Sequence, residues 1–322
     1  MLKRKLIVAA LSLLTLAFSM QPIALAQARG SGLSISPTLT QLTLNPGESK
    51  TLTYQIRNAT IGSINAVPSV EDFAADGTTG NPKLLTGPGQ SSPYSIKNFV
   101  YQLDQVPLDP GVQKNISVGL HIPDGTAPGA YYGVITYKAV PTTGSASAPG
   151  QVSLTASVGS IVLITVPGKI YQQVQFSAIH IYRGSNDATL FFTKPDKIGI
   201  EIRNLGNGFV QPFGSVEVQD MFNKSVDTFQ FNNPKQLGNI LPKSTRIFTN
   251  SFTGVGGAGR YKVTASVSYG TGGDVLIMQK TFWYIPAWLA IIILLVVAVL
   301  LFLAYKAFTH HRRHGKSFRR RS

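Results

Sequence analysis

Four aspartates gathered along one stretch of the chain have the side chains that acid–base catalysis needs: Asp72, Asp76, Asp104 and Asp109. Two carboxylates placed across a glycosidic bond can hydrolyse it, so one hypothesis is a carbohydrate-active hydrolase whose cleft lies in residues 73–107. The opposing interpretation is structural, because Asp76-Gly77 and Asp109-Pro110-Gly111 have the composition of ordinary turns. Their spacing also differs from that of an EF-hand calcium loop. We therefore expect turns here and no enzymatic activity.

Other residue types that carry chemistry are few. The chain has no cysteine, which excludes thiolate metal sites and a cysteine nucleophile. Its five histidines are divided between the body of the chain and its last residues. His121 alternates with apolar neighbours and is therefore predicted to face solvent from a strand, while His310, His311 and His314 extend a basic tail. We predict no cofactor and no metal.

The elements that must position these residues have the patterns of β-strands. Leu52, Tyr54 and Ile56 alternate with polar residues, as in a strand with one buried face. No stretch between residues 27 and 284 sustains the apolar spacing of a helix. Short strands separated by Gly, Pro and Asn turns indicate a β-sandwich.

The chain also matches itself at an offset of 146 residues. Ile56-Arg57-Asn58 corresponds to Ile202-Arg203-Asn204, and Ser69-Val70-Glu71 to Ser215-Val216-Glu217. Further on, Gly129-Ala130-Tyr131 and Gly259-Arg260-Tyr261 each open an alternating strand. Asn207-Gly208, in the second copy, predicts a β-hairpin. The fold class that follows is all-β: two tandem immunoglobulin-like β-sandwiches followed by one transmembrane α-helix.

The first residues have the three parts of a secretory signal. Lys3, Arg4 and Lys5 precede an apolar run that is too short to span a membrane, and Ala24-Leu25-Ala26 supplies the small residues of a cleavage site. We predict a signal peptide over residues 1–26, with cleavage between Ala26 and Gln27.

The last forty residues predict a membrane anchor. The segment from Ile285 to Ala304 has no charged residue and is long enough for a bilayer core of ~30 Å. Trp283 and Trp288 mark one interface. The tail after it has seven basic residues and no acid, which places it in the cytoplasm and the N-terminal part outside the cell; the nearest of these residues are Lys306, Arg312 and Arg313.

The formal net charge of +15 is explained by this topology. The signal contributes three positive charges and the tail seven, which leaves +5 for everything between them. We therefore predict contact with membrane lipid through the span and the basic tail, and no nucleic-acid binding.

The predicted organisation has five parts: signal peptide 1–26, first sandwich 27–167, second sandwich 168–284, transmembrane helix 285–305 and basic tail 306–322. The first sandwich contains an insertion, residues 73–107, that the second lacks, and extra loops on a repeated scaffold are common binding sites. Candidate contact residues in it are aromatic or acidic: Phe73, Asp76, Tyr94, Phe99 and Tyr101. Alternatively, Phe99 and Tyr101 complete a core strand, because they alternate within residues 96–103.

The chain resembles the WxL-interacting-protein family of bacterial surface proteins. The residues that carry the resemblance are Leu44-Asn45-Pro46-Gly47-Glu48, Ile56-Arg57-Asn58, Leu108-Asp109-Pro110-Gly111, Ile122-Pro123 and the run from Pro128 to Ile135, all between residues 33 and 137. The resemblance implies a membrane-anchored protein whose first domain binds peptidoglycan and whose second binds a WxL-domain surface protein. No Leu-Pro-x-Thr-Gly sorting signal precedes the apolar segment, so the helix itself is the expected anchor.

We therefore expect a non-enzymatic cell-surface protein that binds a component of the cell envelope, either a cell wall polymer or an exported surface protein. Two alternatives stay open at this point. One is the carbohydrate-active hydrolase, and the other is a passive subunit that tethers an envelope complex.

Overall fold

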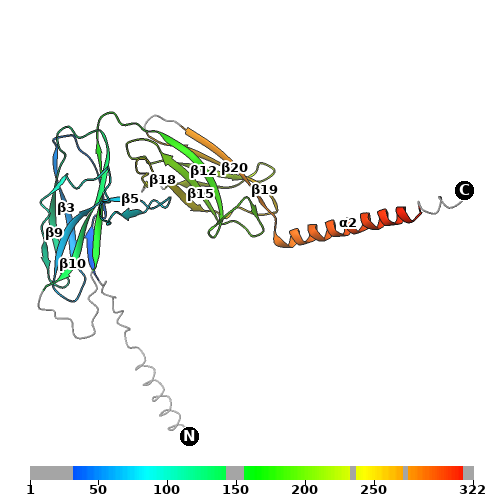
Figure 1. Cartoon of the computed structure of the whole chain (residues 1–322), viewed down its shortest axis with the longest axis horizontal. Coiled ribbons are helices and arrows are strands. Elements are labelled where there is room, and N and C mark those ends of the chain that lie inside the picture. The colour runs from blue at the N-terminus through cyan, green and yellow to red at the C-terminus, as the bar shows by residue number, and fades with distance from the viewer. Residues whose placement is uncertain (1–31, 143–155, 233–236, 271–274, 315–322) are drawn as a thin grey trace, which may run out of the picture.

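The computed structural model describes residues 32–142, 156–232, 237–270 and 275–314. Two β-sandwiches follow one another along the chain, and a single long helix leaves the second (Figure 1). The predicted fold class is therefore confirmed. The predicted cleavage site, Ala26 and Gln27, lies outside the described residues.

The first sandwich packs a four-stranded sheet on a five-stranded sheet. The order in the four-stranded sheet is β1 (Leu33–Ser36), β3 (Ser49–Asn58), β9 (Gln113–His121) and β7 (Val100–Tyr101). The order in the five-stranded sheet is β2 (Leu39–Thr43), β11 (Ser157–Val166), β10 (Gly129–Pro141), β4 (Ile64–Glu71) and β8 (Val106–Leu108). A separate hairpin consists of β5 (Phe73–Ala75) and β6 (Pro82–Leu84).

The second sandwich repeats this plan. Its four-stranded sheet has the order β13 (Asn186–Asp187), β12 (Val174–Arg183), β15 (Lys197–Asn204) and β18 (Thr245–Ser251). Its five-stranded sheet has the order β14 (Leu190–Phe191), β20 (Val275–Tyr284), β19 (Gly259–Ser268), β16 (Phe213–Gln219) and β17 (Ser225–Phe231). In both sandwiches a short early strand pairs in parallel with the last one, β2 with β11 and β14 with β20.

The internal repeat is visible in one hydrogen-bonding pattern. Asn58 and Asn204 end the equivalent strands β3 and β15, and both are completely buried. Each amide nitrogen donates to two carbonyls, at 2.8 and 3.1 Å, one of which belongs to the glycine four residues on. Each amide oxygen accepts a backbone N–H two residues on, at 2.8 Å. The 146-residue offset thus corresponds to two copies of the same buried corner.

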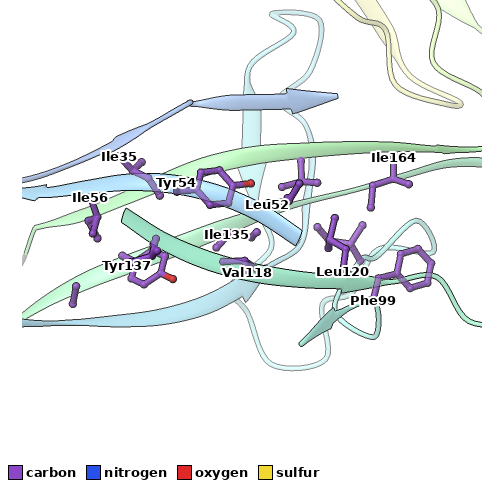
Figure 2. Close-up of a cluster of buried hydrophobic side chains, with 14 of the residues drawn as sticks. Ile35, Leu52, Tyr54, Ile56, Phe99, Val118, Leu120, Ile135, Tyr137 and Ile164 are labelled. Carbon is purple, nitrogen blue, oxygen red and sulfur yellow. The ribbon is translucent and has the colours of Figure 1, made fainter. Parts of the chain in front are cut away.

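The cores agree with the predicted alternation. Leu52, Tyr54 and Ile56 point into the first core together with Ile135 and Tyr137 from the facing sheet (Figure 2). The second core contains the corresponding set from β15 and β19. Its completely buried members are Ile202, Val263, Ala265 and Val267. His121 is exposed at the end of β9, as predicted, and its Nδ1 lies 2.9 Å from the Ser49 hydroxyl.

The predicted membrane segment is helical. Two residues separate the end of β20 from helix α2 (Ala287–His314), which continues past Lys306 through Arg312 and Arg313. Its first 22 residues, Ala287–Phe308, have a mean hydropathy of 3.2 and no part buried against the sandwiches. By length and composition this helix is able to cross a membrane.

Candidate functional site

The insertion of the first sandwich divides into two parts. Its later residues complete the two sheets: β7 pairs with β9, and β8 pairs with β4. Phe99 is only 7% exposed in the first core, while Tyr101 is 42% exposed and its ring covers Gly119 on the neighbouring strand. Phe99 is thus a core residue, and the two aromatic residues do not form one surface.

The earlier part of the insertion reaches toward the second sandwich, as the β5–β6 hairpin in Figure 1 shows. Phe73 is 3% exposed, and its ring centroid lies 4.9 Å from that of Tyr132 on β10. Tyr94 stacks on the same ring, with the centroids 5.5 Å apart. Phe209 of the second sandwich completes the group, 6.1 Å from Tyr132. Two of the predicted contact residues therefore build the joint between the sandwiches.

The tip of the hairpin touches the edge of the second sandwich. Thr78 O accepts the backbone N–H of Ile247, on the edge strand β18, at 2.8 Å. Asp76, a predicted contact residue, is exposed in the same tip, where its carbonyl accepts Thr79 N–H. Gly80 has a φ of +76°, and any side chain there would overlap the guanidinium of Arg246. A glycine is therefore required where the hairpin passes this arginine.

Arg246 stands between the hairpin and the body of the second sandwich. Its Nη1 donates to Asn239 O at 2.8 Å, and its guanidinium carbon lies 4.8 Å from the centroid of Phe248. Burial lowers the pKa of Arg246, but an arginine side chain stays protonated at neutral pH. The residue thus supplies a fixed positive charge beside the joint.

Asn207 forms a second bridge between the sandwiches. Its backbone O accepts Ala130 N–H at 2.9 Å, and its Nδ2 donates to Pro128 O at 3.2 Å. The prediction of a hairpin at Asn207-Gly208 is wrong. The strand before this dipeptide, β15, belongs to one sheet and the strand after it, β16, to the other. The turn therefore carries the chain between layers, and its tip is free to meet the first sandwich.

Between these two bridges lie two adjoining cavities, which we call the interdomain cleft. Their volumes are about 360 and 460 Å³, and both are lined by Leu163, Leu237 and Asn239. The wall from the first sandwich is the outer face of its five-stranded sheet, and the hairpin closes one side. Residues of the first sandwich in the walls are Leu39, Gln41, Leu42, Thr43, Phe73, Ala75, Gly80, Asn81, Pro82, Ile161, Leu163 and Thr165. Among the residues that the structure describes, none that lines either cavity is a carboxylate.

The four aspartates that suggested hydrolysis serve other purposes. Asp72 is completely buried, with Oδ2 3.3 Å from Lys97 Nζ and 3.3 Å from Ser92 N. Asp109 accepts the Ser63 hydroxyl at 2.8 Å in a turn, and Asp76 is in the hairpin tip. Asp104 is exposed, and its charge, after burial of the ring, is a cause of the pKa of Tyr137 being raised to about 12. Among the described residues, no three His, Cys, Asp or Glu side chains are grouped to hold a metal ion.

The second sandwich also has a polar cluster that the sequence did not predict. His180 Nδ1 lies 2.6 Å from Asp187 Oδ2, and its Nε2 lies 2.8 Å from Glu201 Oε2. Burial lowers the pKa of His180, but the hydrogen bonds to the two carboxylates outweigh burial, and the pKa is raised overall. The cluster lies on β12, β13 and β15 and does not line the interdomain cleft.

A scan against protein-family models and a search of the curated proteins found no match to this chain. Solved structures with a similar fold include the class 5 fimbriae chaperone CfaA, at 14% identity and a TM-score of 0.39 over 79% of this chain and 100% of that one. A chain of the chaperone–tip subunit complex CsuC–CsuE from Acinetobacter baumannii matches at 11% identity and a TM-score of 0.37, over 77% and 97%. A chain of the Salmonella enterica SafA pilin–SafB chaperone complex matches at 13% identity and 0.36, over 78% and 96%. These values describe a likeness of fold alone.

Phe73 is the one predicted contact residue among the described residues of the cleft wall, and the others were missed by the sequence analysis, although a signal was present. Residues 160–166 of β11 are almost continuously apolar where a strand with one buried face would alternate. Such a run indicates a strand covered on both faces. In the structure Val162 and Ile164 face the core, and Leu163 faces the cleft.

Proposed function

We propose that this chain is a membrane-anchored, non-enzymatic binding protein that takes an extended segment of an exported protein into the interdomain cleft. The observation that carries the proposal is an open apolar part of the outer face of the first sandwich. Leu39 is 42% exposed there, beside Ile161 and Leu163, between the hairpin and the second sandwich. An apolar surface held open between two domains is a usual place for a ligand.

The strand at the rim of this face favours a polypeptide ligand. β2 pairs with β11 on one side and forms the edge of its sheet on the other. An edge strand offers backbone N–H and C=O groups to an added strand, and pockets beside it select alternate side chains. A glycan strand has neither the backbone amides to extend the sheet nor apolar side chains for the floor beside Leu163.

Charge in the walls is consistent with binding and gives no support to hydrolysis. Arg246 provides a positive charge, and the lining residues within the described part of the chain include no carboxylate. General acid–base cleavage of a glycosidic bond requires two such groups. We therefore do not carry the hydrolase hypothesis forward.

The anchor and its orientation complete the proposal. We infer that α2 crosses the membrane, with the tail that contains Lys306, Arg312 and Arg313 in the cytoplasm and both sandwiches outside. The resemblance to WxL-interacting proteins supplies two candidate partners, peptidoglycan and a WxL-domain surface protein. The apolar cleft supports the protein partner of these two.

A matched pair of substitutions tests the cleft. Leu39→Glu places a charge on the cleft floor, and Val140→Glu places one on the same sheet, at a position 40% exposed, against 42% for Leu39. Ala130 contacts the second sandwich, and Val140 lies ten residues further along the same strand. Val140 is therefore about 33 Å from Ala130. Both variants are expressed in full length, and bound material is recovered from membranes with and without digestion of the wall.

We expect the wild type and Val140→Glu to recover an exported protein, also after digestion of the wall. Leu39→Glu should fail to recover it. Retained binding by Leu39→Glu would remove the cleft as the site. Binding that disappears with the wall would identify the wall polymer as the ligand.

A further inference from the structure

Several large apolar side chains are exposed at the end of the second sandwich nearest to α2. β20 ends at Tyr284 and α2 begins at Ala287, so only two residues separate the sheet from the helix. Figure 1 shows the helix leaving directly from this end of the sandwich. With α2 in a bilayer, this end lies at the lipid surface.

One edge of the five-stranded sheet brings apolar residues to this level. Leu190 pairs with Trp283, Phe191 pairs with Tyr284, and Phe191 O accepts Ile285 N–H at 2.8 Å. The next residue, Phe192, is therefore level with the start of α2. Its side chain is 50% exposed, and those of Leu190 and Trp283 are 46% and 48% exposed.

On the other side of β20, the turn between β16 and β17 also brings apolar residues to the level of the helix start. Gly259 pairs with Tyr284, and a Cβ on Gly259 would lie 2.8 Å from Met221 Sδ. Met221 is therefore at the level of the last residue of β20. Its neighbour Phe222 is 81% exposed at the tip of the turn. Asp220 Oδ1 accepts the N–H groups of Phe222 and Lys224, so the turn keeps its shape through its own hydrogen bonds.

The chemistry of this end fits a lipid–water interface. Phenylalanine, methionine and tryptophan side chains enter the acyl boundary, and long cationic side chains beside them reach the phosphates. Lys194, Lys224 and Arg260 are exposed at this end. The nearby carboxylate of Asp220 accepts two backbone N–H groups. Its negative charge therefore offsets the positive charge of these side chains only in small part.

We propose that these side chains form a second membrane-binding surface, the membrane-proximal collar: Leu190, Phe192, Met221, Phe222 and Trp283. The collar enters the headgroup region of the bilayer that holds α2. Its two edges, β14 and β16, are three strand spacings apart, about 14 Å, with β20 between them. Contacts on both sides of the helix attachment hold the second sandwich at a fixed tilt, which a two-residue connection alone does not do.

The two tryptophans of the chain allow a direct test in the full-length protein. Trp283→Phe together with Trp288→Phe removes all intrinsic tryptophan fluorescence, since the chain has two tryptophans. In that background, Phe222→Trp and Phe192→Trp place a probe on each edge of the collar. Ile61→Trp places a control on the first sandwich, at a position that is 87% exposed. Each protein is reconstituted in phosphatidylcholine vesicles with and without bromine on the upper acyl chain.

Brominated lipid should remove most of the fluorescence of the Phe222→Trp and Phe192→Trp proteins and none of that of the Ile61→Trp protein. Quenching on one edge alone, or on neither, overturns the collar. A protein that retains Trp288 as its single tryptophan reports on α2: loss of its quenching would overturn the membrane anchor itself. Circular dichroism of each variant confirms that the sandwiches are folded.

Discussion

Replacing Asn204 with alanine tests the buried corner that both sandwiches share. The substitution removes three hydrogen bonds, two donated by Nδ2 to Gly208 O and Ile240 O and one accepted by Oδ1 from Gly206 N–H. Asn204 is completely buried. Ile240 O still accepts the N–H of Val210 at 3.2 Å, but Gly208 O and Gly206 N–H lose their bonds to the amide in a place that water reaches poorly.

The expected loss follows from these bonds. A typical intramolecular hydrogen bond contributes about 1 kcal/mol net, and an unsatisfied buried group costs about 1 to 3 kcal/mol. Partial relaxation of the chain and entry of a water molecule reduce the sum. We expect Asn204→Ala to lower the free energy of unfolding of the second sandwich by about 2 to 4 kcal/mol.

Trp283, on the last strand of the second sandwich, provides the assay. In full-length protein with Trp288→Phe, the urea dependence of Trp283 fluorescence follows the unfolding of that sandwich. The matched control is Asn250→Ala, which removes one exposed hydrogen bond, to Gln230 O at 3.3 Å. A loss for Asn204→Ala no larger than that of Asn250→Ala would refute the assignment of this corner as a determinant of stability.

Three further predictions concern charge and topology. Lys97→Ala should lower the free energy of unfolding by about 1 to 3 kcal/mol, because it strips the buried Asp72 carboxylate of its cation, whereas Asp72→Asn should be nearly neutral; equal losses in denaturant titrations would contradict this. The raised pKa of His180 means that its contribution to stability is complete below about pH 6.5 and is lost as the pH rises through the folded pKa. Wild type and His180→Gln should therefore converge in stability at alkaline pH, and a difference that stays constant with pH would argue against the cluster. Protease added to intact cells should degrade both sandwiches and spare a tag placed after Ser322, and a tag cut from outside would reverse the topology.

Most of the fold was predictable because it is encoded by local patterns. The alternation around Tyr54 gives the strand and its buried face, and the match of Ile56-Arg57-Asn58 with Ile202-Arg203-Asn204 gives the duplication. Both follow from the two-residue period of a strand and from a repeated requirement for a buried amide. The helix follows from the length of an uncharged run.

The role of the insertion was harder to predict, because aromatic residues have the same appearance in a core, in a joint and in a binding surface. Phe99 serves the first core, Phe73 and Tyr94 serve the joint, and Tyr101 remains at the surface. These outcomes depend on which sheet each residue joins. Short strands such as β7, with two residues, have too few positions for a periodic pattern to identify.

The cleft itself depends on contacts that side-chain patterns do not report. One bridge joins Thr78 O to Ile247 N–H, and the other joins Asn207 O to Ala130 N–H, so both use backbone atoms that every residue type except proline possesses. The sequence shows only two residues that fit these contacts. One is Gly80, where the hairpin passes Arg246, and the other is the apolar Leu163 on the outward face of β11. The two bridges stand on either side of the open face near Leu39, and they keep the sandwiches from closing over it. An apolar face of this kind would collapse onto its neighbour if the joint were free. The backbone bridges therefore preserve the cleft that we propose as the ligand site.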